Sequence, residues 1–255
     1  MKVTILGCHG GVAPGYRTSS YMVNDGFLID AGSAASALTP SRQRKIEDIF
    51  ITHAHIDHIK DICFLIDNTF YDDRAVLKLR STPLILENIH KHMFNDILWP
   101  DFSKIYVGKS KSKALLDFVP FEKEISFSGL KISHCTVNHI GPAIGYILDD
   151  GKKQVVFTGD TGPTDEIWEA ASRCKNLQAV FTEISFPNNM DELARASGHF
   201  TLDQLLKDLK KLRQTEVPIH IAHFKPRFFE DLMDEFHRYA PVRMRLLHQE
   251  DEFVF

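Results

Sequence analysis

The sequence lacks the features that would place it in a membrane or in an oxidising compartment. No apolar stretch approaches the length needed to span a bilayer, and no signal pattern precedes the first strand-like run at residues 3–6. The 4 cysteines are scattered, with no pair at the spacing of a zinc clip. We therefore expect a cytoplasmic protein with reduced thiols and no membrane partner.

Positive charge is also scarce. Lys and Arg total 30 against 34 Asp and Glu, which gives a formal net charge of −4. There is thus no global electrostatic reason to bind a polyanion, and polymeric nucleic acid is not an expected partner. One basic cluster stands out, formed by Lys104, Lys109, Lys111 and Lys113. A solvated loop is its simplest interpretation, and contact with a phosphate is the alternative.

Internal repeats, low-complexity runs and linkers are missing as well, and we expect a single domain over residues 1–255. Strand-like and helical patterns follow one another along the chain. The turn residues at 24–26 (Asn-Asp-Gly) and at 149–151 (Asp-Asp-Gly) predict two hairpins. Apolar spacing predicts helices over 201–212 and about 227–239, and Thr164 is expected to cap a helix that reaches about Cys174.

What the sequence does contain is a dense group of metal-binding side chains at 52–58, Thr-His-Ala-His-Ile-Asp-His. The group follows an apolar run at 49–51, typical of a buried strand, and precedes a helical pattern. His53 and His55 alternate like strand residues and so face the same side, whereas Asp57 and His58 lie past the bend. Imidazole and carboxylate are the usual ligands of zinc and neighbouring metals, so this turn predicts a metal site.

Further candidate ligands stand at the ends of later strand-like runs, namely His139, Asp160 and His223. Together with the turn they form two sets that share Asp160. The first set is His53, His55, His139 and Asp160, and the second is Asp57, His58, His223 and Asp160. Two metals bridged by a carboxylate lie about 3.5–4 Å apart and activate a water molecule between them. Hydrolysis of a phosphate or carboxylic ester is the expected chemistry.

These residues resemble the metallo-β-lactamase superfamily, in which His-x-His-x-Asp-His, here at 53–58, is followed by His139, Asp160 and His223. All seven ligand positions of its two-metal members have a match. Glu183, residues 197–201 (Ser-Gly-His-Phe-Thr) and residues 223–227 (His-Phe-Lys-Pro-Arg) are similar to elements of tRNase Z. The blocks at 99–102 (Trp-Pro-Asp-Phe) and 183–188 (Glu-Ile-Ser-Phe-Pro-Asn) resemble more closely the class II 3′,5′-cyclic-nucleotide phosphodiesterases.

The resemblance implies an α/β fold, an αβ/βα four-layer sandwich with two mixed β-sheets. It implies two divalent metal ions as cofactors, zinc first, with manganese or iron as alternatives. The implied activity is a metal-dependent phosphodiesterase that converts a small-molecule 3′,5′-cyclic nucleotide, cAMP or cGMP, to the 5′-monophosphate. A tRNase Z-like endoribonuclease and a non-catalytic nucleotide-binding regulator are the alternatives. The oligomeric state is open, and a homodimer is what the family suggests.

The same resemblance makes Asp57, Glu183 and His199 the candidate catalytic residues. His199 is expected to reach the substrate phosphate from outside the metal shell, stabilise the transition-state charge and give a proton to the leaving 3′ oxygen. Glu183 is expected to hold the ring of His199. A plainer interpretation is that His199 caps the following helix and that Glu183 pairs with a lysine. His9 and His134 have no assigned role.

Overall fold

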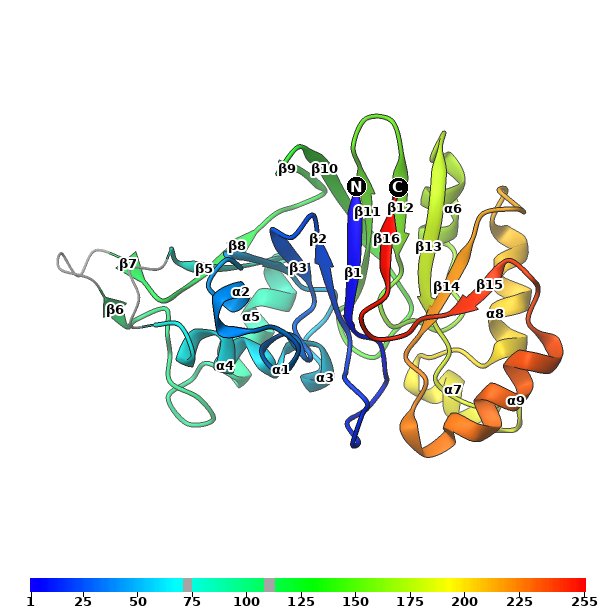
Figure 1. Ribbon diagram of the computed structural model, residues 1–255, viewed down its shortest axis with the longest axis horizontal. Helices are drawn as coiled ribbons and strands as arrows, with labels where there is room; N and C mark the ends of the chain where they lie inside the picture. Colours follow the sequence, from blue (N-terminus) through cyan, green and yellow to red (C-terminus); the bar gives the residue numbers. More distant parts are fainter. Residues whose placement is uncertain (71–74, 108–112) are drawn as a thin grey trace. The chain divides into compact units, whose positions relative to one another are not determined.

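The computed structural model describes residues 1–70, 75–107 and 113–255, and its chain divides into two compact units (Figure 1). Unit 1 comprises Met1–Gly7, Ser19–Glu122 and Gln249–Val254, and unit 2 comprises Cys8–Thr18, Lys123–His248 and Phe255. Each unit contains one mixed sheet of seven strands. The predicted α/β class with two mixed sheets is therefore confirmed, and the single domain over residues 1–255 stays a prediction.

The sheet of unit 1 is antiparallel at one side and parallel at the other. In spatial order its strands are β16 (Glu252–Val254), β1 (Lys2–Gly7), β2 (Ser20–Val23), β3 (Phe27–Ile29), β4 (Asp48–Phe50), β5 (Leu77–Ser81) and β8 (Leu116–Pro120). Pairing is antiparallel from β16 to β3 and parallel from β3 to β8. The predicted first hairpin joins β2 to β3, and the positive φ angles of Asn24 (50°) and Asp25 (52°) fit a type I′ turn.

Short helices accompany this sheet. They are α1 (Ala34–Ala37), α2 (Pro40–Gln43), α3 (Ile56–Ile59), α4 (Asp61–Asp67) and α5 (Pro83–His92), and a small ribbon pairs β6 (Tyr106–Val107) with β7 (Lys113–Ala114). The longest of them, α5, begins at Pro83, directly after Thr82, whose hydroxyl accepts a hydrogen bond from the Ile85 N–H. Unit 1 thus places short helices directly after its parallel strands.

The Trp-Pro-Asp block after α5 has a structural role centred on Asp101. This buried carboxylate lies 3.0 Å from His90 Nε2 and 2.8 Å from Lys104 Nζ, and it also accepts from Ser103. Burial raises the pKa of Asp101, but these partners outweigh it and hold that pKa well below its usual range. Lys104, one member of the predicted basic cluster, is therefore engaged in an ion pair, Lys113 is exposed, and Lys109 and Lys111 lie outside the described residues.

The sheet of unit 2 repeats the mixed pattern. In spatial order its strands are β15 (Met244–Leu246), β14 (Ile219–Ala222), β13 (Leu177–Glu183), β12 (Gln154–Phe157), β11 (Ile144–Asp149), β10 (Leu130–Thr136) and β9 (Glu124–Phe127). Pairing is parallel from β15 to β12 and antiparallel from β12 to β9. The second predicted hairpin joins β11 to β12.

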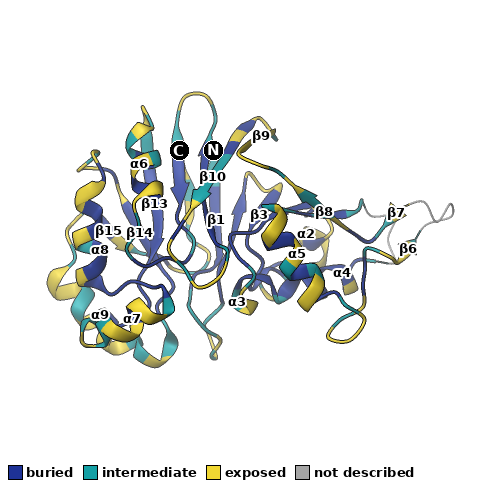
Figure 2. Cartoon of the chain, turned by 180° about the vertical axis from the view of Figure 1, so that it is seen from behind, coloured by how far each residue is buried: buried dark blue, intermediate teal, exposed yellow. Residues whose placement is uncertain are grey.

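Helices pack against the sheet in the core of unit 2. They are α6 (Glu166–Arg173), α7 (Asp191–Ser197), α8 (Leu202–Asp208) and α9 (Phe229–Tyr239), with 3-10 turns η1 (Asn188–Met190), η2 (Leu209–Lys211) and η3 (Pro226–Phe228). Trp168 of α6 is fully buried and donates its indole N–H to Asp208. Figure 2 shows the strands mostly buried, whereas helix α8 carries exposed residues on one face.

One predicted N-cap was wrong by one residue. Helix α6 begins at Glu166, and Asp165 rather than Thr164 occupies the N-cap position. The cause is a tertiary contact, since the Thr164 N–H donates to Asp208 and its carbonyl accepts from Lys211. The predicted helices at 201–212 and 227–239 correspond to α8 with η2 and to α9 with η3. Among the described residues, none of the helices combines the length and apolar character that a bilayer crossing needs.

Candidate metal centre

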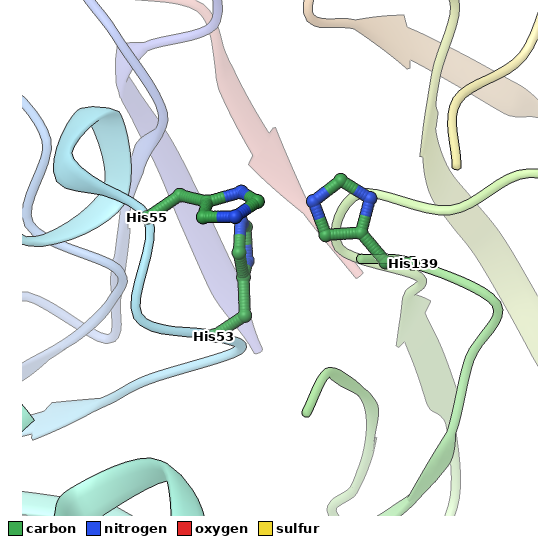
Figure 3. A group of neighbouring side chains, drawn as sticks. All are labelled: His53, His55 and His139. Atoms are coloured by element: carbon green, nitrogen blue, oxygen red, sulfur yellow. The ribbon is translucent and has the colours of Figure 1, made fainter. Parts of the chain in front are cut away.

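The turn at 52–58 in unit 1 has the predicted strand-to-helix geometry. Strand β4 ends at Phe50, and α3 begins at Ile56 with His55 at its N-cap position. The His53 ring centroid lies 4.6 Å from that of His55, with the rings nearly perpendicular at 83° (Figure 3), and 4.2 Å from that of His58. His53 and His58 are buried, Asp57 is half-buried, and His55 is exposed. Three imidazoles and a carboxylate therefore gather at one turn.

Asp30, at the end of β3, anchors this turn from behind. Its carboxylate accepts hydrogen bonds from the Thr52 N–H (2.8 Å) and the Thr52 hydroxyl (2.7 Å), and it lies 2.7 Å from His58 Nδ1. Because an ionised carboxylate only accepts, His58 Nδ1 carries the proton and Nε2 keeps a lone pair for a metal. Sequence reasoning missed Asp30, although a carboxylate at a strand end beside the next strand's turn was the available signal.

Asp30→Asn is expected to weaken metal binding by about 10–100-fold, the usual cost of losing a carboxylate behind a ligating histidine. The amide presents one acceptor where the carboxylate presents two, so Thr52 and His58 no longer have their full set of partners. Metal titration of the purified variant measures the effect. Asp48→Asn is the matched control, because it removes another buried carboxylate of unit 1, one that pairs with Arg80. Equal metal affinity in wild type and Asp30→Asn contradicts the assignment.

In unit 2 the predicted ligands stand just past strand ends. His139 follows β10, Asp160 follows β12 and His223 directly follows β14. His139 Nδ1 donates to the Gly198 carbonyl at 2.7 Å, which leaves its Nε2 available for a metal. Gly198 has a φ of +65°, and a Cβ there would lie 2.8 Å from His139 Cα. The loop after α7 therefore requires glycine to hold this ring.

His223 is held in a strained backbone conformation by residues of the loop that starts at Cys8. Its φ is +67°, unusual for a residue with a Cβ. The His223 N–H donates to the Cys8 carbonyl at 2.6 Å, and a Cβ at Gly10 would lie 2.5 Å from the His223 carbonyl oxygen. This loop thus positions a predicted ligand. His9 within it packs edge-on against Tyr16, and burial lowers the pKa of His9.

The donor atoms of unit 2 suit a divalent cation. His223 Nε2 lies 3.0 Å from Asp160 Oδ2, and both side chains are buried. An imidazole nitrogen and a carboxylate oxygen at that separation are donors that one cation of the zinc type can hold together. His139, Asp160 and His199 also offer ligand atoms within 4.8 Å of one another. The residues present therefore fit a metal, both here and at the turn of unit 1.

Glu183 and His199 form a buried pair beside these ligands. Glu183 is the last residue of β13, and its Oε1 lies 2.7 Å from His199 Nδ1. Helix α8 is capped by Thr201 in a capping box with Gln204, so His199 is not the cap, and Glu183 contacts the imidazole rather than a lysine. The contact between Glu183 and His199 agrees with the expectation that Glu183 holds the His199 ring. The catalytic roles of Asp57, Glu183 and His199 stay predictions.

The seven predicted ligands are thus divided between the units. His53, His55, Asp57 and His58 lie in unit 1, and His139, Asp160 and His223 lie in unit 2. His134 lies on β10 beside Tyr146. Ser185 contacts His199 and His223. Sequence reasoning did not single out this residue.

Comparisons with known proteins show what this chain is similar to. Residues 26–221 match the family model described as the beta-lactamase superfamily domain. A probable 3′,5′-cyclic-nucleotide phosphodiesterase from Yersinia pestis is 25% identical over 276 residues, covering 89% of this chain and 79% of that protein. A ribonuclease Z from Methanococcus maripaludis is 29% identical over 289 residues, covering 90% of this chain and 89% of that protein. The crystal structure of unliganded yeast PDE1 has a TM-score of 0.76 at 16% identity, covering 98% of each chain.

Proposed function

The chain belongs to the β-lactamase superfamily, and from that premise we propose that it is a metal-dependent phosphodiesterase whose preferred substrate is a 3′,5′-cyclic nucleotide. The observation that carries the proposal is the buried Glu183–His199 pair set beside His139, Asp160 and His223. A metal-dependent hydrolase that does not protonate its leaving group needs only side chains that bind the metal. An imidazole held by a carboxylate next to them adds a proton donor for a leaving oxygen.

The proposed ligand sets are those expected from the sequence. One cation would be held by His53, His55, His139 and Asp160, and the other by Asp57, His58, His223 and Asp160. When bound, the two cations supply a water activated near neutral pH and neutralise charge on the phosphate. The chain itself fixes the ligand rings, with Asp30 behind His58 and the Gly198 carbonyl behind His139.

His199 acts on the leaving group in this proposal. Glu183 fixes Nδ1, so Nε2 is the atom that faces substrate and gives the proton to the departing 3′ oxygen. Ring contacts keep His199 in that orientation, because its centroid lies 5.3 Å from that of His223 and 5.8 Å from that of Phe186. Cleavage of the P–O3′ bond in a cyclic nucleotide then yields the 5′-monophosphate.

A tRNase Z-like endoribonuclease is the second candidate, favoured by the 29% identity to the Methanococcus maripaludis ribonuclease Z. Such an enzyme must grip a long polyanion. The net charge of −4 opposes this, and Lys104 is already paired with Asp101. The Trp-Pro-Asp block to which Asp101 belongs is also a feature of the phosphodiesterase-like sequence pattern. A small cyclic substrate therefore suits the chain better.

Turnover of cAMP or cGMP is expected to exceed cleavage of precursor tRNA at equal concentrations of metal-loaded enzyme. The measurement is a parallel rate assay on cAMP, cGMP, a linear bis-ester and precursor tRNA, with metal content determined on the same sample. Faster cleavage of the tRNA would favour the ribonuclease. Stoichiometric metal with no turnover of any of these substrates would favour a nucleotide-binding regulator.

A further inference from the structure

Ser185 is a buried hydroxyl that contacts three residues of the candidate centre in unit 2. Its side chain is 0% exposed. The Oγ atom lies 2.8 Å from Glu183 Oε2, 2.8 Å from His223 Nδ1 and 3.2 Å from His199 Nδ1. It stands two residues after Glu183, just beyond the end of β13. One small side chain therefore touches a predicted metal ligand, a predicted proton donor and the carboxylate that holds that donor.

The chemistry of these groups fixes the direction of the hydrogen bonds. An ionised carboxylate only accepts, so the single proton of the Ser185 hydroxyl is donated to Glu183 Oε2. The Ser185 oxygen must then accept from His223, whose Nδ1 consequently carries a proton. The Nε2 of His223 is left with a lone pair, 3.0 Å from Asp160 Oδ2. The hydroxyl thus selects the tautomer that a metal ligand needs.

In the same arrangement, the two oxygens of Glu183 accept hydrogen bonds from different partners. Oε2 accepts from Ser185, and Oε1 accepts from His199 Nδ1 at 2.7 Å and from the Thr161 N–H at 3.3 Å. A continuous chain of bonds therefore runs from His223 through Ser185 and Glu183 to His199. Buried hydrogen bonds in such a chain polarise one another, so a change at one end alters the bond at the other.

We propose that Ser185 is a positioning residue that couples the metal ligand His223 to the proton donor His199. The inference rests on the proposed function, because it assumes that His223 binds a metal and that His199 serves the leaving group. A cation on Nε2 of His223 draws electron density through Nδ1 and strengthens its bond to the Ser185 hydroxyl. That hydroxyl in turn binds Glu183 more tightly and sets how the carboxylate holds His199.

Ser185→Ala tests the coupling, because it removes the hydroxyl and adds no bulk. Zinc titration without substrate is expected to show one site weakened by about 10–100-fold, and kcat is expected to fall by a similar factor while KM changes little. In nitrogen-15 NMR, zinc is expected to shift the His199 ring signals of the wild type. In Ser185→Ala that zinc-induced shift is expected to be smaller than in the wild type even at saturating zinc, a result that a merely structural serine would not give.

Three further variants test the interpretation. Ser185→Thr keeps the hydroxyl and is expected to restore zinc affinity and the His199 shift. If the melting temperature of Ser185→Thr falls below that of Ser185→Ala, Ser185→Cys takes its place. Cysteine is a weaker donor of similar size, so its zinc affinity and His199 shift are expected to lie between those of the serine and alanine proteins. Ser81→Ala removes an equally buried hydroxyl of unit 1, which bonds the Ile51 carbonyl. Ser81→Ala is expected to leave the His199 shift intact.

The outcomes separate the two proposals. Zinc affinity and a His199 shift equal to wild type in Ser185→Ala overturn the coupling and leave the phosphodiesterase proposal standing. A wild type that binds zinc and shows the shift, but hydrolyses no phosphodiester, overturns the proposed function and supports the hydrogen-bonded chain. A wild type that binds none of zinc, manganese and iron overturns both.

Discussion

His55→Ala is expected to abolish turnover of cyclic nucleotide and to lower the bound metal from about two ions per chain to about one or fewer. The change removes one imidazole from the first ligand set. Its effect on folding should be small, because His55 is exposed, its side chain does not cap α3, and it has extended φ and ψ angles that alanine readily adopts. Metal analysis of the purified variant and a hydrolysis assay on the same sample give the result.

The matched control is His92→Ala at the end of α5. His92 is an exposed histidine of the same unit, outside every predicted ligand set, and its replacement is expected to preserve both metal content and rate. Wild-type activity in His55→Ala would refute the two-metal assignment. Equal loss in both variants would point to damage unrelated to metal binding, which a melting curve without metal would reveal.

His199→Ala is expected to lower kcat by about 10²–10⁴-fold while the metal remains bound. That loss corresponds to about 2.7–5.4 kcal/mol of transition-state stabilisation. The physical reason is that the strongly basic 3′ alkoxide must leave without a proton donor. The Gly198 carbonyl still holds His139, and the His223–Asp160 contact does not involve His199, so the predicted ligands keep their places. Rates at saturating cAMP, with metal content on each sample, provide the measurement.

A substrate with a weakly basic leaving group separates proton donation from general damage. A bis(p-nitrophenyl) phosphate ester releases a stable anion, so its hydrolysis by His199→Ala is expected to fall far less than hydrolysis of cAMP. His199→Gln keeps hydrogen-bonding capacity but has no acidic proton at that position, and it is expected to behave like alanine. An equal loss on both substrates would remove His199 from the role of proton donor.

Sequence reasoning placed the candidate ligands at strand ends because those positions follow from local patterns. The apolar run at 49–51 and the helical spacing after His58 were enough to place a strand-to-helix turn at 52–58. The two hairpins followed from turn residues that tolerate positive φ, as Asn24 does. Each of these features depends on a few neighbouring residues, and the structure confirms them.

Residues that act across long sequence separations were not predictable in this way. Asp30 contacts His58 from 28 positions away, and Ser185 contacts His223 from 38 positions away. Thr164 failed as a helix cap for the same reason, since its N–H is engaged by Asp208 on α8. A buried carboxylate or hydroxyl has no periodicity of its own, so its role becomes visible only when the pairing of strands is known. The resemblance to a known family supplied the predicted metal ligands but not these supporting residues.

The pairing of β1 with β16 has a consequence for how the chain is made. Lys2 is opposite Val254, and Ile5 exchanges backbone bonds with Glu250 and Asp251. Unit 1 therefore combines residues 1–7 with residues 249–254, whereas nearly all of unit 2 is synthesised in between. During translation the sheet of unit 1 must wait for its last strand until the ribosome has released residues beyond 250, and closing so long a loop is slow. This topology therefore makes folding during synthesis, rather than catalysis, the stage at which the protein is most easily disturbed.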